Sequence, residues 1–181
     1  MSKNKEENVE NFVIKPIGIV RSNYREASLK YQNRDLKLDE DILSRSKTGK
    51  DQISELIIYE TYEECLEGIE DFSHIIVLYW SHTVGEEARS VYKVHPAGKN
   101  EFPMVGVFAT RSPIRPNPIC STTVELLERD GRVLKVIGLD ALDRSPIIDI
   151  KFHHPSYDSP SNVELADWME ELLDFFRNKT K

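Results

Sequence analysis

The stretch TTVELLERDGRVLKVIGL, residues 122–139, carries the strongest fold signal in the chain. Residues 122–128 and 132–139 are both β-rich, and the dipeptide Asp130-Gly131 stands between them. An Asp-Gly pair between two such runs favours a tight turn that joins antiparallel strands. The stretch therefore predicts a β-hairpin.

Further strands are predicted on both sides of this hairpin. They cover residues 12–21, 53–60, 72–82, 105–110 and 147–152. Residues 62–69 are expected to form a short helix with one apolar face, and residues 163–177 a longer amphipathic helix. Residues 22–50 are polar and lack a sustained period, so we expect either an ordered lid or a mobile loop there.

Together these elements favour a mainly β (α+β) fold. Hairpins and loops connect the strands, and few helices are available to link parallel strands. An antiparallel sheet that closes, or nearly closes, into a β-barrel with a few decorating helices is therefore expected. Residues 1–11 are predicted to be a polar tail and residues 12–158 the barrel domain. Residues 159–181 are predicted to supply the amphipathic helix, packed on the barrel.

The composition is that of a soluble globular protein. Of the 181 residues, 39% are apolar and 30% are charged, which suits one domain with a substantial core. No apolar run approaches the roughly 20 residues that a membrane span needs. Residues 1–11 lack the apolar core of a signal peptide. We therefore expect a cytoplasmic protein without a membrane partner.

Metal and disulfide chemistry are not indicated. The only two cysteines, Cys65 and Cys120, have no CxxC or Cys/His spacing, and we expect both to be small buried residues. His153 and His154 are adjacent, so they project in different directions, and no further ligand accompanies them. No metal site is predicted.

The net charge of -7 is unfavourable for binding a nucleic acid, because phosphate neutralisation usually supplies much of that affinity. The acidic residues are nevertheless concentrated in two segments, residues 60–71 and 164–174. Residues 111–115 are locally positive, and lysines and an arginine lie before and after them. A basic face on an acidic protein is compatible with this distribution.

A second unusual stretch, GVFATRSPIRPNPI, covers residues 106–119 and contains three of the nine prolines. Proline disfavours helical angles at the residue before it, which here applies to Ser112, Arg115 and Asn117. A stiff loop of this kind can hold the guanidinium groups of Arg111 and Arg115 in fixed directions, as recognition of a carboxylate, a phosphate or a base edge requires. The alternative is a surface connection with two solvated arginines.

The remaining candidate residues have ordinary structural explanations by local pattern. His82 ends an apolar strand, and Asp140 and Asp143 stand in a turn where aspartates commonly cap the backbone. Asp149 and Lys151 alternate along a predicted strand, so they lie on one side about 6.6 Å apart and often form only an ion pair. No G-x-G-x-x-G or G-x-x-x-x-G-K-[ST] motif marks a nucleotide loop.

Three segments in this order resemble the TsaA-like (TrmO) family: FSHIIVLYWSH, GVFATRSPIRPNPI and LDALDRSPIIDIK. Members use S-adenosylmethionine to methylate N6 of threonylcarbamoyladenosine 37 in tRNA. The resemblance extends over roughly residues 12–158. It implies a β-barrel methyltransferase that forms a homodimer with the cofactor site near the interface, with tRNA, and not DNA, as its partner.

The resemblance also implies roles for individual residues. Cofactor contacts are expected from Gln32, His82, Thr83, Arg111, Asp140, Ala141, Leu142 and Asp143. Asp149 and Lys151 are expected at the catalytic end, and Arg115 and Asn117 at the substrate.

The chain departs from the family pattern at Cys120, Arg144 and Phe152-His153. Methylation of another nucleoside or a small molecule, or a non-catalytic S-adenosylmethionine- or RNA-binding module, therefore stays open. Tyr31, Phe152 and Tyr157 are aromatic residues that can stack on a base.

Overall fold

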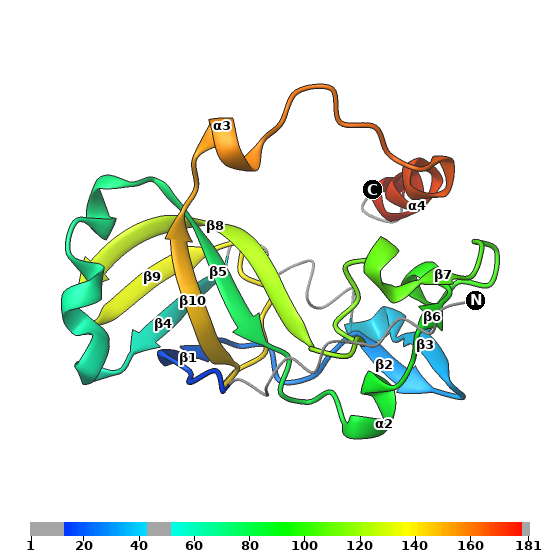
Figure 1. Cartoon of the computed structure of the whole chain (residues 1–181), viewed down its shortest axis with the longest axis horizontal. Coiled ribbons are helices and arrows are strands. Elements are labelled where there is room, and N and C mark those ends of the chain that lie inside the picture. Colours follow the sequence, from blue (N-terminus) through cyan, green and yellow to red (C-terminus); the bar gives the residue numbers. More distant parts are fainter. Residues whose placement is uncertain (1–12, 43–51, 179–181) are drawn as a thin grey trace, which may run out of the picture.

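The computed structural model describes residues 13–42 and 52–178. Six strands form a closed antiparallel barrel in the order β1-β10-β5-β8-β9-β4 (Figure 1). These strands are β1 Gly18–Arg21, β4 Ile53–Ile58, β5 His74–Trp80, β8 Ile119–Asp130, β9 Val133–Ile137 and β10 Pro146–Phe152. The expected antiparallel β-barrel is confirmed. The predicted tail, residues 1–11, lies outside the described residues.

The short strand β1 closes the barrel by pairing with β10 on one side and β4 on the other. Gly18 lies opposite Ile147 and Ile58, and a Cβ atom at Gly18 would approach the Ile57 carbonyl oxygen to 2.4 Å. Only glycine therefore fits this point of closure without moving the β4 backbone.

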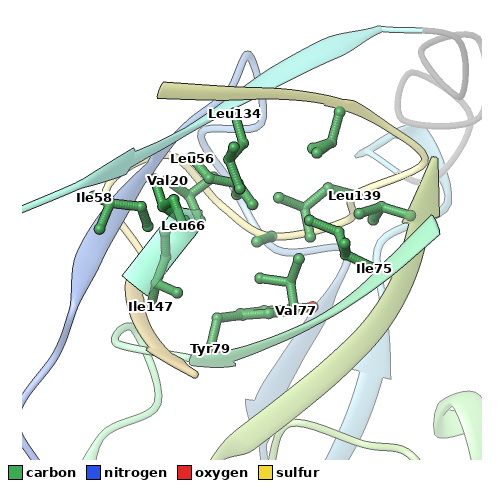
Figure 2. Packing of buried hydrophobic residues seen from close by; sticks show 13 residues of the cluster. Val20, Leu56, Ile58, Leu66, Ile75, Val77, Tyr79, Leu134, Leu139 and Ile147 are labelled. Carbon is green, nitrogen blue, oxygen red and sulfur yellow. The ribbon is translucent and has the colours of Figure 1, made fainter. Parts of the chain in front are cut away.

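Alternate residues of the strands fill the barrel interior, as Figure 2 shows. Its fully buried members are Val20, Leu56, Ile58, Ile75, Val77, Val124, Leu134, Val136 and Ile147. Each buried aliphatic side chain of this kind contributes about 1.5–3 kcal/mol relative to exposure. The two-residue alternation that places these side chains inside also determines which residues face outward.

The predicted hairpin is confirmed. Strands β8 and β9 pair antiparallel around Gly131, whose φ of 56° is the left-handed value that a tight turn needs. Strand β8 begins at Ile119, earlier than expected. It therefore extends past the hairpin to the end of the barrel that is reached by the proline-rich loop of residues 110–118, which we call the arginine loop.

A smaller lobe stands beside the barrel. It contains the hairpin of β2 (Leu29–Gln32) and β3 (Asp35–Leu38), the pair β6 (Lys93–Val94) and β7 (Val105–Gly106), helix α2 (Glu86–Arg89) and the 3-10 turn η3 (Pro96–Gly98). Leu36, Val84, Val94 and Ile114 belong to its core. The β2–β3 hairpin shows that residues 29–38 are an ordered part of the polar segment 22–50, whose residues 43–50 lie outside the described residues.

Several local predictions differ from the structure. Residues 105–110 form only the short strand β7 before a 3-10 turn, η4 (Val107–Ala109). The turn forms because the Val107 carbonyl accepts from both the backbone and the hydroxyl of Thr110. The helix expected at residues 62–69 is instead two 3-10 helices, η1 (Glu60–Leu66) and η2 (Ile69–Asp71), interrupted by left-handed Gly68. Cys65 is exposed and Cys120 half-buried, so the expectation of two buried cysteines was wrong.

The C-terminal segment begins with a single turn, α3 (Pro155–Asp158), and ends in helix α4 (Asp167–Asn178). Helix α4 begins at Asp167, later than the predicted Val163. In Figure 1 it lies on the same side of the molecule as β6 and β7, and Lys99 Nζ stands 4.8 Å from the Phe175 ring centroid. No described helix has the length and apolar character to cross a membrane.

The proline-rich loop between η4 and β8 is organised around Arg115. Its Nε donates to the Ser112 carbonyl at 2.7 Å, and its Nη2 donates to the Thr110 carbonyl at 2.6 Å and the Val107 carbonyl at 3.4 Å. The side chain thus turns back into its own loop. A charged, planar donor that serves three carbonyls holds the loop in one shape.

We expect Arg115→Ala to destabilise the protein, because it removes these hydrogen bonds together. Hydrogen bonds from charged donors contribute about 1.5–3 kcal/mol each and are not additive, so the free energy of unfolding should fall by about 2–4 kcal/mol. For a chain of this size the melting temperature should drop by roughly 5–10 °C. Thermal unfolding followed by circular dichroism measures this change.

The matched control is Arg111→Ala, which removes an exposed arginine of the same loop. It should lower the melting temperature less than Arg115→Ala does, because it removes one exposed hydrogen bond to a backbone carbonyl where Arg115→Ala removes three. Equal melting temperatures for the two variants would contradict the role given to Arg115.

Candidate functional site

A cleft of about 950 Å³ opens at the end of the barrel where β8 begins. It is lined mainly by residues 24–29, the arginine loop, the start of β8, and the connection from β9 to β10, together with Ile42 and with Tyr79 and Ser81 at the end of β5. Phe176 of α4 also lines the cleft. The cleft therefore lies between the barrel, the smaller lobe and the C-terminal helix.

Two oppositely charged residues of this cleft, Arg111 and Asp140, are hydrogen-bonded to neighbouring residues of one strand. Arg111 Nη2 donates to the backbone carbonyl of Ser121 at 2.6 Å, and Thr122 Oγ1 donates to Asp140 Oδ1 at 2.6 Å. Ser121 and Thr122 are consecutive residues of β8. Among the described residues no ion pair joins Arg111 to Asp140. Both charged groups therefore keep bonding capacity for a ligand.

The carboxylate of Asp140 influences the acidic groups around it. Burial, with the nearby Asp140 charge as the next cause, raises the pKa values of Tyr24, Tyr79 and Cys120. At Cys120 the positive charges of Arg115 and Arg111 act in the opposite direction. The cleft thus combines a fixed negative centre with two arginines, and its phenols and thiol stay neutral near pH 7.

The turn that carries Asp140 is fastened to the chain after β1. Ser22 Oγ donates to the Ala141 carbonyl at 2.9 Å, and Asp143 accepts from the Ser22 backbone at 3.1 Å and from Arg25. Arg144 donates its backbone N–H to the Val20 carbonyl at 2.7 Å. Ala141 and Asp143 therefore shape the turn, whereas Asp140 and Leu142 line the cleft.

Only some of the other predicted site residues reach this cleft. Exposed His82 lies at its edge, where Nδ1 is 3.3 Å from the hydroxyl of Ser145, a cleft residue. Thr83 and Asn117 are exposed and are not among the lining residues. Gln32 lies in a separate depression on the β2–β3 hairpin.

The predicted catalytic pair lies apart from the cleft. Lys151 Nζ is 2.6 Å from Asp149 Oδ2 on β10; the Lys151 side chain is 63% exposed and that of Asp149 44%. Their mutual hydrogen bond raises the pKa of Lys151. Neither residue lines the cleft, so the structure does not bring them together with the other site residues. Their catalytic role stays a prediction.

The three aromatic residues considered for base stacking also lie elsewhere. Phe152 stacks on Phe72 with ring centroids 4.6 Å apart, and exposed Tyr157 packs near His154. Tyr31 packs against the core of the smaller lobe. None of the three lines the cleft.

Several cleft residues were not predicted from the sequence. Tyr79 belongs to an apolar strand and resembles a core residue, and Thr122 belongs to the hairpin. Tyr24, Phe108 and Phe176 come from segments whose local pattern carries no functional signal. Only Tyr79 offered a signal in the sequence, because a tyrosine near the end of a buried strand usually needs a hydrogen-bond partner for its hydroxyl.

The chain has relatives with similar sequences over most of its length. A "Probable S-adenosyl-L-methionine-binding protein" of Archaeoglobus fulgidus is 41% identical over 159 residues, which are 87% of this chain and 38% of that protein. Another A. fulgidus protein, named S-adenosyl-L-methionine-binding protein, is 41% identical over 152 residues, or 84% of this chain and 96% of the relative. The human tRNA (adenine(37)-N6)-methyltransferase is 39% identical over 118 residues, 65% of this chain and 25% of the human protein.

The fold is also similar to a solved structure, that of TrmO from Pseudomonas aeruginosa. The TM-score is 0.63 at 25% identity, and the match covers 90% of this chain and 63% of the other. The chain thus spans less than two thirds of that protein, of the human enzyme and of the first A. fulgidus relative. The family model of the tRNA-methyltransferase O N-terminal domain matches residues 35–159, a range that includes the arginine loop and the Asp140 turn, and the chain belongs to this family.

Proposed function

We propose that the protein is an S-adenosylmethionine-dependent methyltransferase that modifies N6 of threonylcarbamoyladenosine 37 in tRNA. The names of the A. fulgidus and human relatives support the cofactor and the tRNA substrate. Within the molecule, the strongest support comes from Arg111 and Asp140, which are anchored on consecutive residues of β8 in one cleft. An amino acid carries a carboxylate and an ammonium on one carbon, so a cation and an anion that line the same cleft are suited to bind these two groups.

The residues of the cleft fit this cofactor. Its volume of about 950 Å³ falls within the usual range for ligand sites. Arg111 suits the carboxylate through its guanidinium fork, and Asp140 suits the ammonium as an acceptor. When bound, S-adenosylmethionine supplies a methyl group activated by its sulfonium. The protein's part is to hold donor and acceptor in a near-attack arrangement and to exclude water.

Positive charge at the cleft also suits an RNA substrate. Arg144 is exposed beside the cleft residue Ser145, and among the described residues no carboxylate forms an ion pair with it. Its guanidinium can meet a backbone phosphate or the carboxylate of the threonylcarbamoyl group. Arg115 serves the same site indirectly, because it fixes the loop from which Arg111 projects.

We further propose that the protein works in the cytoplasm as a homodimer with the cleft near the interface. Tyr92, Met104 and Phe108 are 74%, 52% and 81% exposed, and they lie beside the paired strands β6 and β7. Phe108 also lines the cleft. Neighbouring large apolar groups with this exposure favour a contact with another protein surface.

The function is tested first with wild-type protein. Calorimetric titration with S-adenosylmethionine should give saturable binding near one site per chain. Incubation with methyl-labelled cofactor should then label tRNA that carries threonylcarbamoyladenosine, and digestion should place the label on that nucleoside. Transcripts with plain adenosine at position 37 are the control and should stay unlabelled.

Other outcomes of these two measurements separate the alternatives. Binding without label on any tRNA would favour a non-catalytic S-adenosylmethionine-binding module. Label on another nucleoside would change the substrate. An absence of binding at high cofactor concentration, with and without tRNA, would overturn the cofactor and the proposed activity together.

Arg111→Ala should weaken cofactor binding while the fold is kept. Loss of a hydrogen-bonded charge pair with the cofactor carboxylate corresponds to about a 10- to 100-fold rise in Kd. Lys15→Ala removes an exposed cation that neither lines the cleft nor lies near β6 and β7, and it is the control, for which Kd should be unchanged. An unchanged Kd for Arg111→Ala would remove Arg111 from the site.

Sedimentation equilibrium should give twice the chain mass of 20.9 kDa at micromolar concentration. Phe108→Ser should shift the protein toward monomer and weaken cofactor binding, because it removes apolar contact area beside the cleft. Tyr157→Ser, which changes an exposed aromatic residue away from the cleft, is the control and should leave both properties unchanged. A wild-type monomer with full cofactor affinity would exclude the dimer as a requirement.

A further inference from the structure

We infer that Tyr79 and Thr122 are positioning residues that aim the Asp140 carboxylate at the ammonium group of an amino-acid-bearing ligand. This inference rests on the proposed function. It gives two residues of the barrel wall a role in recognising the amino-acid group of the cofactor.

The two hydroxyl groups converge on a single oxygen. Tyr79 Oη donates to Asp140 Oδ1 at 2.9 Å, and Thr122 Oγ1 donates to the same oxygen at 2.6 Å. Asp140 lies in the connection between β9 and β10, two residues after Gly138, whose φ is 92°. Because Asp140 is not part of a strand, pairing with a neighbouring strand does not fix the position of its side chain. Two donors from adjacent barrel strands therefore fix the Asp140 side chain, while the bonds from Ser22 hold the backbone of the turn.

Tyr79 is suited to this task because it is part of the barrel core. Its side chain is only 6% exposed and packs with the other core residues, as Figure 2 shows. A buried phenol must satisfy its hydroxyl, and Asp140 accepts that bond. Burial and the Asp140 charge raise the pKa of Tyr79, so the hydroxyl keeps its proton and remains a donor.

The arrangement leaves the second carboxylate oxygen for a ligand. No hydrogen bond from a described residue reaches Asp140 Oδ2, and the residue lines the cleft. Among the groups of the proposed cofactor, an ammonium offers N–H donors and a full positive charge, whereas ribose hydroxyls are neutral and a sulfonium has no N–H. Because Arg111 is anchored on Ser121, next to Thr122, it can hold the carboxylate borne by the same carbon.

The inference is tested by the affinities of three ligands. S-adenosylmethionine carries both the amino-acid group and the sulfonium, S-adenosylhomocysteine keeps only the amino-acid group, and 5′-methylthioadenosine has neither. Calorimetry measures each Kd for the wild type, Tyr79→Phe, Thr122→Val, the double variant and Asp140→Asn. Tyr79→Phe deletes only the hydroxyl, so the ring still fills the core.

We expect Tyr79→Phe to weaken both amino-acid-bearing ligands about 5- to 10-fold and to change 5′-methylthioadenosine by less than about 2-fold. The double variant should approach the loss caused by Asp140→Asn, and Thr122→Ser should restore binding relative to Thr122→Val. Two controls remove the same groups away from the cleft: Tyr62→Phe in the partly buried set packed on the barrel core, and Thr61→Val in η1. Both should leave all three Kd values unchanged.

The other outcomes overturn the inference in distinguishable ways. Equal losses for all three ligands would make Tyr79 a structural residue only. Loss for S-adenosylmethionine alone would assign Asp140 to the sulfonium, and unchanged affinities would remove the hydroxyls from ligand recognition. Wild-type protein that binds none of the three ligands would overturn the proposed function, and the inference with it.

Discussion

Closure of the barrel through β1 is the constraint on which the rest of the structure depends. This strand pairs with β10 and β4 at once, so the sheet has no open edge and its strands have fixed neighbours. Closure requires Gly18, because the β4 backbone approaches that residue closely. It also fixes where the chain leaves β1, at Ser22, which is the point that holds the Asp140 turn. The position of the cleft thus follows from how the barrel closes.

Within the cleft, the two arginines of one loop have different tasks. Arg115 donates to three carbonyls of its own loop, whereas Arg111 donates to β8 and keeps bonding capacity toward the cleft. A guanidinium that is already used for folding cannot recognise a ligand with the same N–H groups. The division explains how a loop without regular secondary structure can present a charged side chain in a fixed direction.

The sequence predicted those features that depend on local patterns. The β8–β9 hairpin followed from Asp130-Gly131, and the barrel followed from strands joined by hairpins and loops, with few helices available to link parallel strands. Residues 105–110 were predicted as a strand because of their apolar run. Nothing in that run indicates that Thr110 donates hydrogen bonds to the Val107 carbonyl and so forms a 3-10 turn. The bond between Tyr79 and Asp140 joins residues 61 positions apart, so only the folded barrel brings them together. The family resemblance named Asp140 and Arg111, but no local pattern showed that they are hydrogen-bonded to two consecutive residues of β8, Thr122 and Ser121.

Of the two acidic segments, the one at residues 164–174 includes part of α4, whose Phe176 lines the cleft, so only the other one is separated from the cleft along β8. The acidic segment of η1 and η2 lies near the Asp130 end of this strand, where Arg129 pairs with Glu70 and donates to the Leu66 carbonyl. Arg111 lies near the other end, beside Ser121. At about 3.3 Å per residue the two ends are roughly 30 Å apart. Exposed charges are screened within about 8 Å at physiological salt, so this acidic segment has little effect on a phosphate at the cleft. Local charge, and not the net charge of the chain, therefore determines which ligands the cleft attracts.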